Sequence, residues 1–249
     1  MAALMLILPI CLNAQTKSDI KSVEELINPG QLKETFIYWG NDLLVIVPDS
    51  VDNRKIIRAF HTPLNPNPET HLNYDNDILD GNTLRPLEKH TSEGSVIYDY
   101  GKNGKVTLKF IGPKKNTVYK TIKTNKPTYI MAGPGTGVLT ASLPLKIGFN
   151  TNFSEIRLSF PYRQTFEVTT VDYTLKVIGE ETITLNNKTI DTYIVEIDSE
   201  QDNLGVYKKS WVTKDAPHYA VKFLYRRKEG NKDYKTGNLF TIGNIFVNR

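Results

Sequence analysis

Residues 105–110 read Lys105-Val106-Thr107-Leu108-Lys109-Phe110, so that a polar residue precedes each apolar one. Successive side chains of an extended strand point to opposite faces, and the three apolar residues therefore share one face while the lysines share the other. Residues 221–226 follow the same rule, with Val221, Phe223 and Tyr225 opposite the basic residues. The pattern predicts strands with one face in a core and the other in water.

Similar patterns predict strands along most of the chain. They cover residues 35–39, 43–47, 55–60, 96–100, 117–123, 156–160, 166–178, 182–185, 189–198, 206–213 and 239–247. Turn signals such as Asp80-Gly81-Asn82 and Asn186-Asn187 separate them. Because no long helical segment lies between the strands, we expect a mainly all-β fold, built as a curved antiparallel sheet or half-barrel.

One short helix is expected near the N-terminus, at residues 19–28. Ser22-Val23-Glu24-Glu25 has the spacing of a capping box, in which the serine side chain and the second glutamate bond each other's backbone amides. Pro29-Gly30 then ends the helix.

Residues 1–14 contain no charged residue and carry the apolar run Leu4-Met5-Leu6-Ile7-Leu8 ahead of the small Ala14. They predict a signal peptide that is cleaved, which places the mature chain in the periplasm or otherwise outside the cytoplasm. A membrane-spanning helix would need about 20 apolar residues. Acylation of Cys11, as in a lipoprotein, is the alternative to its removal.

We expect residues 15–249 to form a single β-rich domain with a long loop at residues 61–93. This segment contains Pro63, Pro66 and Pro68 and three of the four histidines. Cys11 is the only cysteine, so cleavage after residue 14 leaves no disulfide, no cysteine nucleophile and no thiolate metal ligand. Stability must then come from a hydrophobic core.

The net charge of +4 is spread over short basic clusters such as Lys114-Lys115, Lys208-Lys209 and Arg226-Arg227-Lys228. Clusters of this size are typical of a solvated surface. A nucleic-acid-binding protein would show a concentrated basic stripe with interleaved aromatic residues, so no nucleic acid partner is expected. Contact with a membrane is expected to be peripheral at most.

A family resemblance rests on five motifs. These are Leu79-Asp80-Gly81-Asn82-Thr83-Leu84-Arg85-Pro86-Leu87, Leu143-Pro144-Leu145-Lys146-Ile147-Gly148-Phe149, Leu175-Lys176-Val177-Ile178-Gly179-Glu180-Glu181-Thr182-Ile183, Thr192-Tyr193-Ile194-Val195-Glu196-Ile197 and Trp211-Val212-Thr213-Lys214-Asp215-Ala216-Pro217-His218. In this order they resemble the domain of unknown function 3108 family of secreted bacterial envelope proteins, over residues 35–226. The resemblance implies a curved sheet akin to the lipoprotein carriers LolA and LolB, whose concave apolar face holds acyl chains. It implies no catalytic residue.

Two motifs have the residue types of a binding loop but not the full pattern. Residues 133–137 read Gly-Pro-Gly-Thr-Gly but lack the lysine of a phosphate-binding loop and precede no helical pattern, so a connection between strands is expected. Asp75, Asp77 and Asp80 resemble part of a calcium loop, but the fifth position is Leu79 and the twelfth is Pro86, so the third alternating carboxylate and the closing glutamate are both missing. A solvated turn is the main interpretation, with a non-standard calcium site as the alternative.

Other chemistry is weakly indicated. The four histidines have no metal-ligand spacing, so no metal site and no cofactor are expected. Glu180 and Glu181 alternate along a strand and should face opposite sides, which prevents shared acid–base work. No nucleophile motif occurs, although a hydrolase site gathering His218, Asp215 and a serine remains an alternative.

Aromatic and branched residues on the strands offer a route to function. If few helices fill a half-barrel, its concave face must be covered by a ligand, a lid or a partner. The residues expected to line this face are Trp39, Tyr173, Val177, Tyr193, Val195, Trp211 and Phe223. The sequence therefore predicts a non-enzymatic envelope protein that binds an apolar or lipid-like ligand.

An adaptor module is the main alternative function. In that hypothesis the apolar face is fully packed, and another envelope protein docks on the 61–93 loop or on an exposed sheet edge such as residues 239–247.

Overall fold

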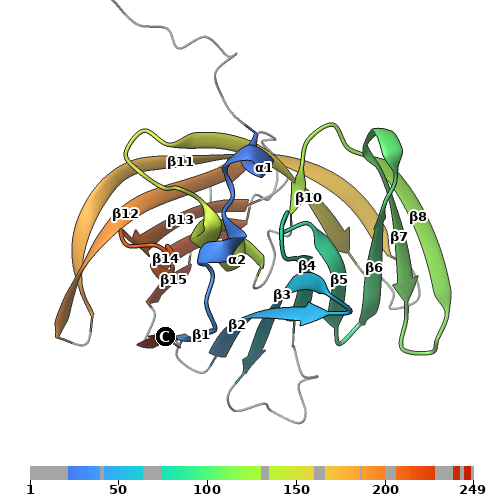
Figure 1. Cartoon of the computed structure of the whole chain (residues 1–249), viewed down its shortest axis with the longest axis horizontal. Helices are drawn as coiled ribbons and strands as arrows, with labels where there is room; N and C mark the ends of the chain where they lie inside the picture. The colour runs from blue at the N-terminus through green and yellow to red at the C-terminus, as the bar shows by residue number, and fades with distance from the viewer. Residues whose placement is uncertain are drawn as a thin grey trace, which may run out of the picture.

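The computed structural model describes residues 22–39, 42–63, 75–129, 135–159, 166–185, 187–199, 206–227, 238–241 and 244–247. These residues form two β-sheets that curve around a shared interior (Figure 1). The first sheet has the strand order β16-β1-β2-β3-β4-β5-β6-β7-β8, and the second has the order β15-β14-β13-β12-β11-β10-β9. The expected all-β class is confirmed, with the strands divided between two sheets.

The strands of the first sheet are β1 (Thr35–Trp39), β2 (Asp42–Val51), β3 (Arg54–Pro63), β4 (Asp75–Asp80), β5 (Pro86–Thr91), β6 (Gly94–Tyr100), β7 (Lys105–Ile111), β8 (Thr117–Lys123) and β16 (Asn244–Val247). Those of the second sheet are β9 (Thr128–Tyr129), β10 (Asn150–Ser159), β11 (Glu167–Leu185), β12 (Lys188–Ser199), β13 (Val206–Thr213), β14 (Ala220–Arg227) and β15 (Asn238–Thr241). Neighbouring strands pair antiparallel, apart from the short parallel pair β9–β10.

Four short helical segments accompany the sheets in the described residues: α1 (Val23–Leu26), α2 (Gly135–Ser142) and the 3₁₀ turns η1 (Pro29–Gln31) and η2 (Lys102–Gly104). None of the helices in this part of the chain is long and apolar enough to cross a membrane.

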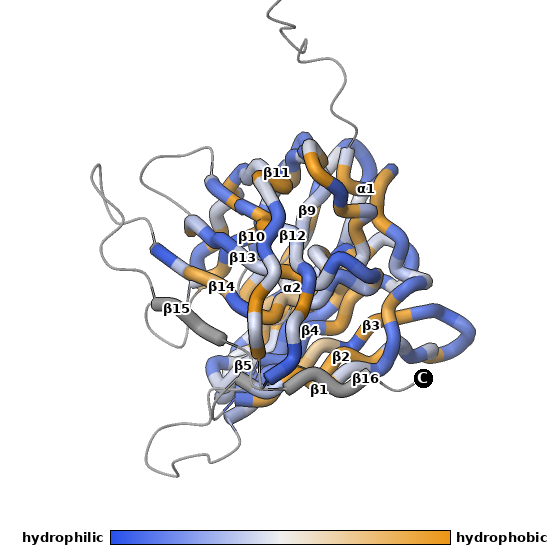
Figure 2. Tube along the Cα trace, turned by 90° about the vertical axis from the view of Figure 1, so that its left-hand side faces the viewer, coloured by the Kyte–Doolittle hydropathy of each residue, from blue (hydrophilic) through white to orange (hydrophobic). Residues whose placement is uncertain are grey.

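The alternation that predicted the strands also sets which face is buried. Val106, Leu108 and Phe110 are at most 1% exposed, whereas Lys105 on the same strand is exposed. Figure 2 shows polar and apolar residues alternating along the tube in this way. The core between the sheets therefore follows directly from the period-two pattern.

The longest strand, β11, bends where its pairing with β12 shifts between Val177 and Gly179. Ile178, the extra residue, is 49% exposed. A β-bulge of this kind increases local twist and curvature. It also shifts the alternation of the side chains, so that Val177 before the bulge and Glu180 after it both lie on the inner face. Residues 166–178 and 182–185, expected as separate strands, are thus one bent strand.

The N-terminal helix is shorter than expected. It spans Val23–Leu26, within the expected range 19–28, whose first three residues lie outside the described part. Ser22 is the N-cap residue, but its side chain makes no capping hydrogen bond, so the capping box is wrong. The backbone leaves the helix at Ile27, and Pro29 opens a 3₁₀ turn instead of simply ending a helix.

The expected long loop at residues 61–93 is wrong for the part that the structure describes. β3 continues to Pro63, and β4 and β5 both lie inside this segment, while residues 64–74 lie outside the described part. These two strands escaped the pattern search because the inner positions hold Asp77 and Lys89 in place of apolar residues. Residues 1–14, the expected signal peptide, also lie outside the described part.

Candidate functional site

Helix α2 lies between the two sheets, where the concave face was expected to be open (Figures 1 and 2). Its residues Val138, Leu139 and Ala141 are at most 1% exposed. They belong to one apolar cluster with Leu44 of the first sheet and Val195 of the second. The helix thus covers inner faces of both sheets. It also corrects the expected strand connection at residues 133–137, whose last residues, Gly135 to Gly137, form the first turn of α2.

Two hydrogen bonds from the segment around η1 reach the C-terminal end of α2. The Gln31 side-chain amide donates a hydrogen bond to the carbonyl of Ala141 at 2.5 Å. The backbone amide of Asn28 donates to the carbonyl of Ser142 at 2.8 Å. Both hydrogen-bond donors belong to the segment around η1, which therefore fixes the position of the C-terminal end of α2.

The structure brings together most of the residues expected to line the concave face. Tyr173, Val177 and Val195 are at most 5% exposed and belong to the same apolar cluster as α2, and Tyr193 packs against it. Phe223 lies on the same inner face, because it pairs with Ser210, which pairs in turn with Val195.

Two of the expected lining residues stand apart from this group. Trp211 lies on the opposite face of the second sheet, where it pairs with Ile194 and packs with Ile183 and Val221. The bulge in β11 turns Glu181 to that outer face as well, and its carboxylate accepts a hydrogen bond from the Trp211 indole at 2.5 Å. The side chain of Trp39 lies outside the described part.

A charged pair lies on the inner face of the first sheet. The amine of Lys89 is 3.0 Å from a carboxylate oxygen of Asp77 and 3.1 Å from one of Asp75. Asp77 is fully buried and Lys89 is 8% exposed. Burial alone would lower the pKa of Lys89, but the two carboxylates outweigh it and raise that pKa, so the lysine stays charged.

The facing sheet contributes a second buried charge. Glu155 is 2% exposed and accepts hydrogen bonds from the Tyr173 hydroxyl at 2.9 Å and from Arg157 at 3.2 Å. Burial raises the pKa of Glu155, against the opposing effect of Arg157. The Tyr98 hydroxyl, near Asp77 and Glu155, is buried and has no hydrogen-bond partner within the described part of the chain. The interior is therefore amphipathic, with a polar cluster beside the apolar cluster of α2.

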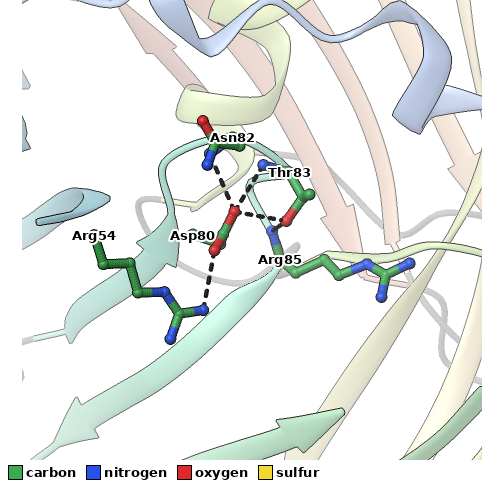
Figure 3. A network of polar contacts seen from close by, with 5 residues as sticks. All are labelled: Arg54, Asp80, Asn82, Thr83 and Arg85. Carbon is green, nitrogen blue, oxygen red and sulfur yellow. Dashed lines mark hydrogen bonds and ion pairs between the residues drawn. The ribbon is translucent and has the colours of Figure 1, made fainter. Parts of the chain in front are cut away.

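The motif Leu79–Leu87 forms the turn between β4 and β5 (Figure 3). One carboxylate oxygen of Asp80 accepts hydrogen bonds from the Asn82 and Thr83 amides and from the Thr83 hydroxyl, while the other accepts one from Arg54 at 3.0 Å. Partial burial would raise the pKa of Asp80, but these hydrogen bonds hold it below its ordinary value. The carboxylate thus fixes the turn, in the way an Asx turn does.

This turn aims Arg85 into a polar cleft of about 420 Å³, lined by Glu24, Tyr100, Lys126 and Thr128 among others. Arg85 forms an ion pair with Glu24 of α1, and its guanidinium carbon lies 5.4 Å from the centroid of the Tyr100 ring. The motif therefore links the first sheet to the N-terminal helix, which is a structural role.

The remaining candidates for chemistry do not form a site in the described residues. His218 uses Nδ1 to contact the backbone carbonyl of Thr213 at 2.8 Å, and no hydrogen bond joins it to Asp215. Asp75 and Asp77 bind Lys89 whereas Asp80 binds the turn, so the three carboxylates do not converge on a cation. No group of three or more His, Cys, Asp or Glu side chains in this part of the chain is arranged to hold a metal.

Glu180 and Glu181 occupy adjacent positions opposite Tyr193 and Thr192, on the two faces of the sheet, as the alternation predicted. Glu180 accepts a hydrogen bond from the amine of Lys214 at 2.5 Å. Each carboxylate thus has its own partner, and the pair is a structural element of the strand.

Comparison with family models matches residues 70–235 to the family described as a protein of unknown function (DUF3108). The chain belongs to the DUF3108 family. The match covers the polar cluster, α2 and nearly all of the second sheet. No curated protein and no solved structure matches the chain.

Sequence reasoning missed two parts of this site. Helix α2 gave no signal because five of its eight residues are glycine, threonine or serine. For the buried polar cluster the sequence does contain a signal that was overlooked. It is a charged residue, Asp77, at an inner position of an alternating strand, between Asp75 and Leu79.

Proposed function

We propose that this protein is a non-enzymatic, extracytoplasmic binding protein that takes an apolar or lipid-like chain between its two sheets, in the space that α2 occupies. The observation that carries the proposal is the burial of Val138, Leu139 and Ala141 of α2 among the inner faces of both sheets. In this proposal α2 is a displaceable plug, and a bound acyl chain replaces its apolar contacts.

The composition of α2 supports displacement. Gly135, Thr136, Gly137, Thr140 and Ser142 are all weak helix formers, and an eight-residue helix is marginal without tertiary contacts. Its apolar side chains contribute burial that a methylene chain could match, since burying each CH₂ is worth about 0.8 kcal/mol. Exchange of the plug for a ligand therefore conserves most of the apolar contact energy.

The surroundings of α2 support an apolar ligand with a polar end. Tyr173, Val177 and Val195 lie on the inner face beside the plug, and Arg157, which is 21% exposed at its side chain, lies at the polar cluster. None of the described residues forms a hydrogen bond with the Tyr98 hydroxyl there. A chain along the apolar cluster would bring its head group toward these polar side chains.

The first experiment identifies what copurifies with the protein. The chain is expressed with its own leader, purified from the periplasm without detergent, and extracted with organic solvent for mass spectrometry. A lipid at about one molecule per protein supports the proposal and names the ligand class. A ligand-free protein that also fails to bind a fluorescent fatty acid contradicts it.

Two variants of the plug sharpen this test. An alanine methyl group at position 137 would lie 3.5 Å from the Leu44 side chain, an ordinary contact, so Gly137→Ala should strengthen α2 by about 1 kcal/mol. Gln31→Ala removes the side-chain hydrogen bond to the carbonyl of Ala141. We expect Gly137→Ala to weaken fatty acid binding about fivefold and Gln31→Ala to strengthen it. Equal affinity in all three proteins would show that α2 does not move.

An adaptor function is the second candidate, and the sheet edges favour it. In the described part of the chain, β15 is one edge strand of the second sheet and β16 is one edge strand of the first, so residues 238–241 and 244–247 lie at sheet edges. An edge strand can add a strand from a partner. Deletion of residues 239–249 should abolish capture of that partner while leaving the monomer soluble, whereas the carrier proposal predicts no partner capture to lose.

A further inference from the structure

Residues 100–126 contain eight lysines and no acidic residue. Since the whole chain carries +4 and this segment carries +8, the remainder of the chain carries −4. The segment comprises β7, β8 and their flanking turns, at the right-hand end of the molecule in Figure 1. A net positive charge is therefore concentrated at this end of the fold, although the clusters at Lys208-Lys209 and Arg226-Arg227-Lys228 lie elsewhere in the sequence.

Six of these lysines form what we call the lysine hairpin: Lys102, Lys105, Lys109, Lys114, Lys115 and Lys123. Five are exposed and Lys109 is partly buried. Lys120 pairs with Leu108 and so lies on the opposite face of β8, outside this group. Within the described part of the chain, none of the six has an ion-pair partner. The eighth, Lys126, pairs with Asp172 at 3.1 Å and is not part of this surface.

The outer face of the hairpin contains an unfavourable pairing of like charges. Lys105 pairs directly with Lys123, and Lys109 pairs with Tyr119. Like charges directly opposite each other on neighbouring strands are destabilising. Lysines on an edge strand protect it from aggregation, but Lys105 and Lys109 lie on β7, one strand in from the edge. Edge protection alone does not explain them.

We propose that the outer face of the lysine hairpin is a docking surface for an anionic lipid bilayer. Lysines near an anionic membrane surface are attracted to its head groups, and this relieves the repulsion between Lys105 and Lys123. Tyr119, which is 63% exposed among them, offers an aromatic ring of the kind that favours the membrane interface. Because the lysines are positively charged, we expect this surface to bind an anionic membrane more tightly than a neutral one.

This surface is separate from the space between the sheets. Val106, Leu108 and Phe110 of β7 point into the core, whereas Lys105 and Lys109 alternate to the outside. Docking through the hairpin therefore leaves the inner faces unchanged. It does not depend on the proposed ligand, and each proposal can fail alone.

The test is co-sedimentation of the full chain with vesicles, so that every variant carries the same N-terminal apolar segment. We expect binding to vesicles of 30% phosphatidylglycerol in phosphatidylcholine at 0.1 M NaCl, and at least tenfold weaker binding to pure phosphatidylcholine. Raising NaCl to 0.5 M should release the protein, because the Debye length falls from about 10 Å to about 4 Å.

The decisive variant combines Lys105→Gln, Lys109→Gln and Lys123→Gln. Each lysine near the surface strengthens binding about fivefold, so the triple variant should bind about 100-fold more weakly. The matched control replaces three exposed lysines elsewhere, Lys55, Lys176 and Lys188, with glutamine. It makes the same change in net charge and should bind as the unmodified protein does.

Folding is followed separately by thermal unfolding, where loss of the Lys105–Lys123 repulsion should leave the triple variant at least as stable as the unmodified protein. Equal loss of binding in both triple variants would overturn the proposal, because net charge alone would then explain it. Binding to soluble polyphosphate without any association with anionic vesicles would also overturn it and assign the surface to a polyanion.

Discussion

The amine of Lys89 on β5 lies 3.0 Å from a carboxylate oxygen of Asp77, its paired residue on β4, and Asp77 is fully buried. Folding therefore transfers both charges from water into the interior between the sheets. Their mutual attraction repays the loss of hydration only while both partners are present, because a single buried charge has no compensation. The pair should be intolerant of single substitutions.

We expect Lys89→Met to destabilise the protein by about 3–5 kcal/mol, since it leaves the Asp77 carboxylate buried without its cation. The double variant Lys89→Met/Asp77→Leu removes both charges and should recover most of that loss. Urea unfolding followed by fluorescence gives the free energies of the four proteins in this cycle. Additive losses in the double variant would mean that the two side chains stabilise the fold independently.

Gly81 follows Asp80 in the turn between β4 and β5, where its backbone contacts Lys55. A methyl group at this position would lie 2.5–2.7 Å from the backbone carbonyl of Lys55. We therefore expect Gly81→Ala to destabilise the protein by about 2 kcal/mol, because backbone atoms on both sides would have to shift. Gly179→Ala is the control, since its methyl group would lie 3.7 Å from Ile194. A thermal unfolding midpoint that is equally low in both variants would contradict this explanation.

The strands were predictable where polar and apolar residues alternate. The expected strand at residues 117–123 coincides with β8, and Val106, Leu108 and Phe110 are buried as the pattern required. The alternation reports only that one face is buried, however. It does not report which face is concave, and for this reason Trp211 was grouped with Val195 although the two lie on opposite faces.

The site was less predictable because tertiary contacts override local preferences in it. Gly135 to Ser142 form a helix only where the two sheets surround them, since these residues have little intrinsic helix propensity. Asp77 and Lys89 read as surface residues, and only the three-dimensional pairing makes them an interior ion pair. The lysines of β7 and β8 were visible in the sequence, but their placement opposite one another depends on the hairpin register.

Two buried tyrosines near the polar cluster should respond in opposite ways to loss of the hydroxyl. Among the residues that the structure describes, the Tyr98 hydroxyl has no hydrogen-bond partner, so Tyr98→Phe should leave stability unchanged or raise it by about 1 kcal/mol. The Tyr173 hydroxyl donates to Glu155 and contacts Arg157, so Tyr173→Phe should cost about 2 kcal/mol. Chemical unfolding of the two variants side by side measures both. Destabilisation by Tyr98→Phe would indicate a partner for its hydroxyl, such as a bound water.

Lys208 should make stability depend on pH in the alkaline range. Its strand position places it on the inner face, opposite Ile197 and Tyr225, and its amine lies 5.0 Å from the centroid of the Phe223 ring. Lys208 is only partly buried as a residue, but desolvation of its amine beside the aromatic ring lowers the pKa of Lys208 from 10.5 to about 8. Between these two values the unfolded chain binds more protons than the folded chain, so stability rises with pH across that window.

Lys208→Met should therefore be more stable than the unmodified protein at pH 7, and the difference should shrink by about 2 kcal/mol between pH 7 and pH 9.5. Measurements stop at pH 9.5 because tyrosine ionisation in the unfolded chain destabilises the fold at higher pH. Lys188→Met, at the exposed start of β12, controls for the loss of a positive charge. A difference that stays constant across this range would place the Lys208 amine in water, where the sheet interior does not control its protonation.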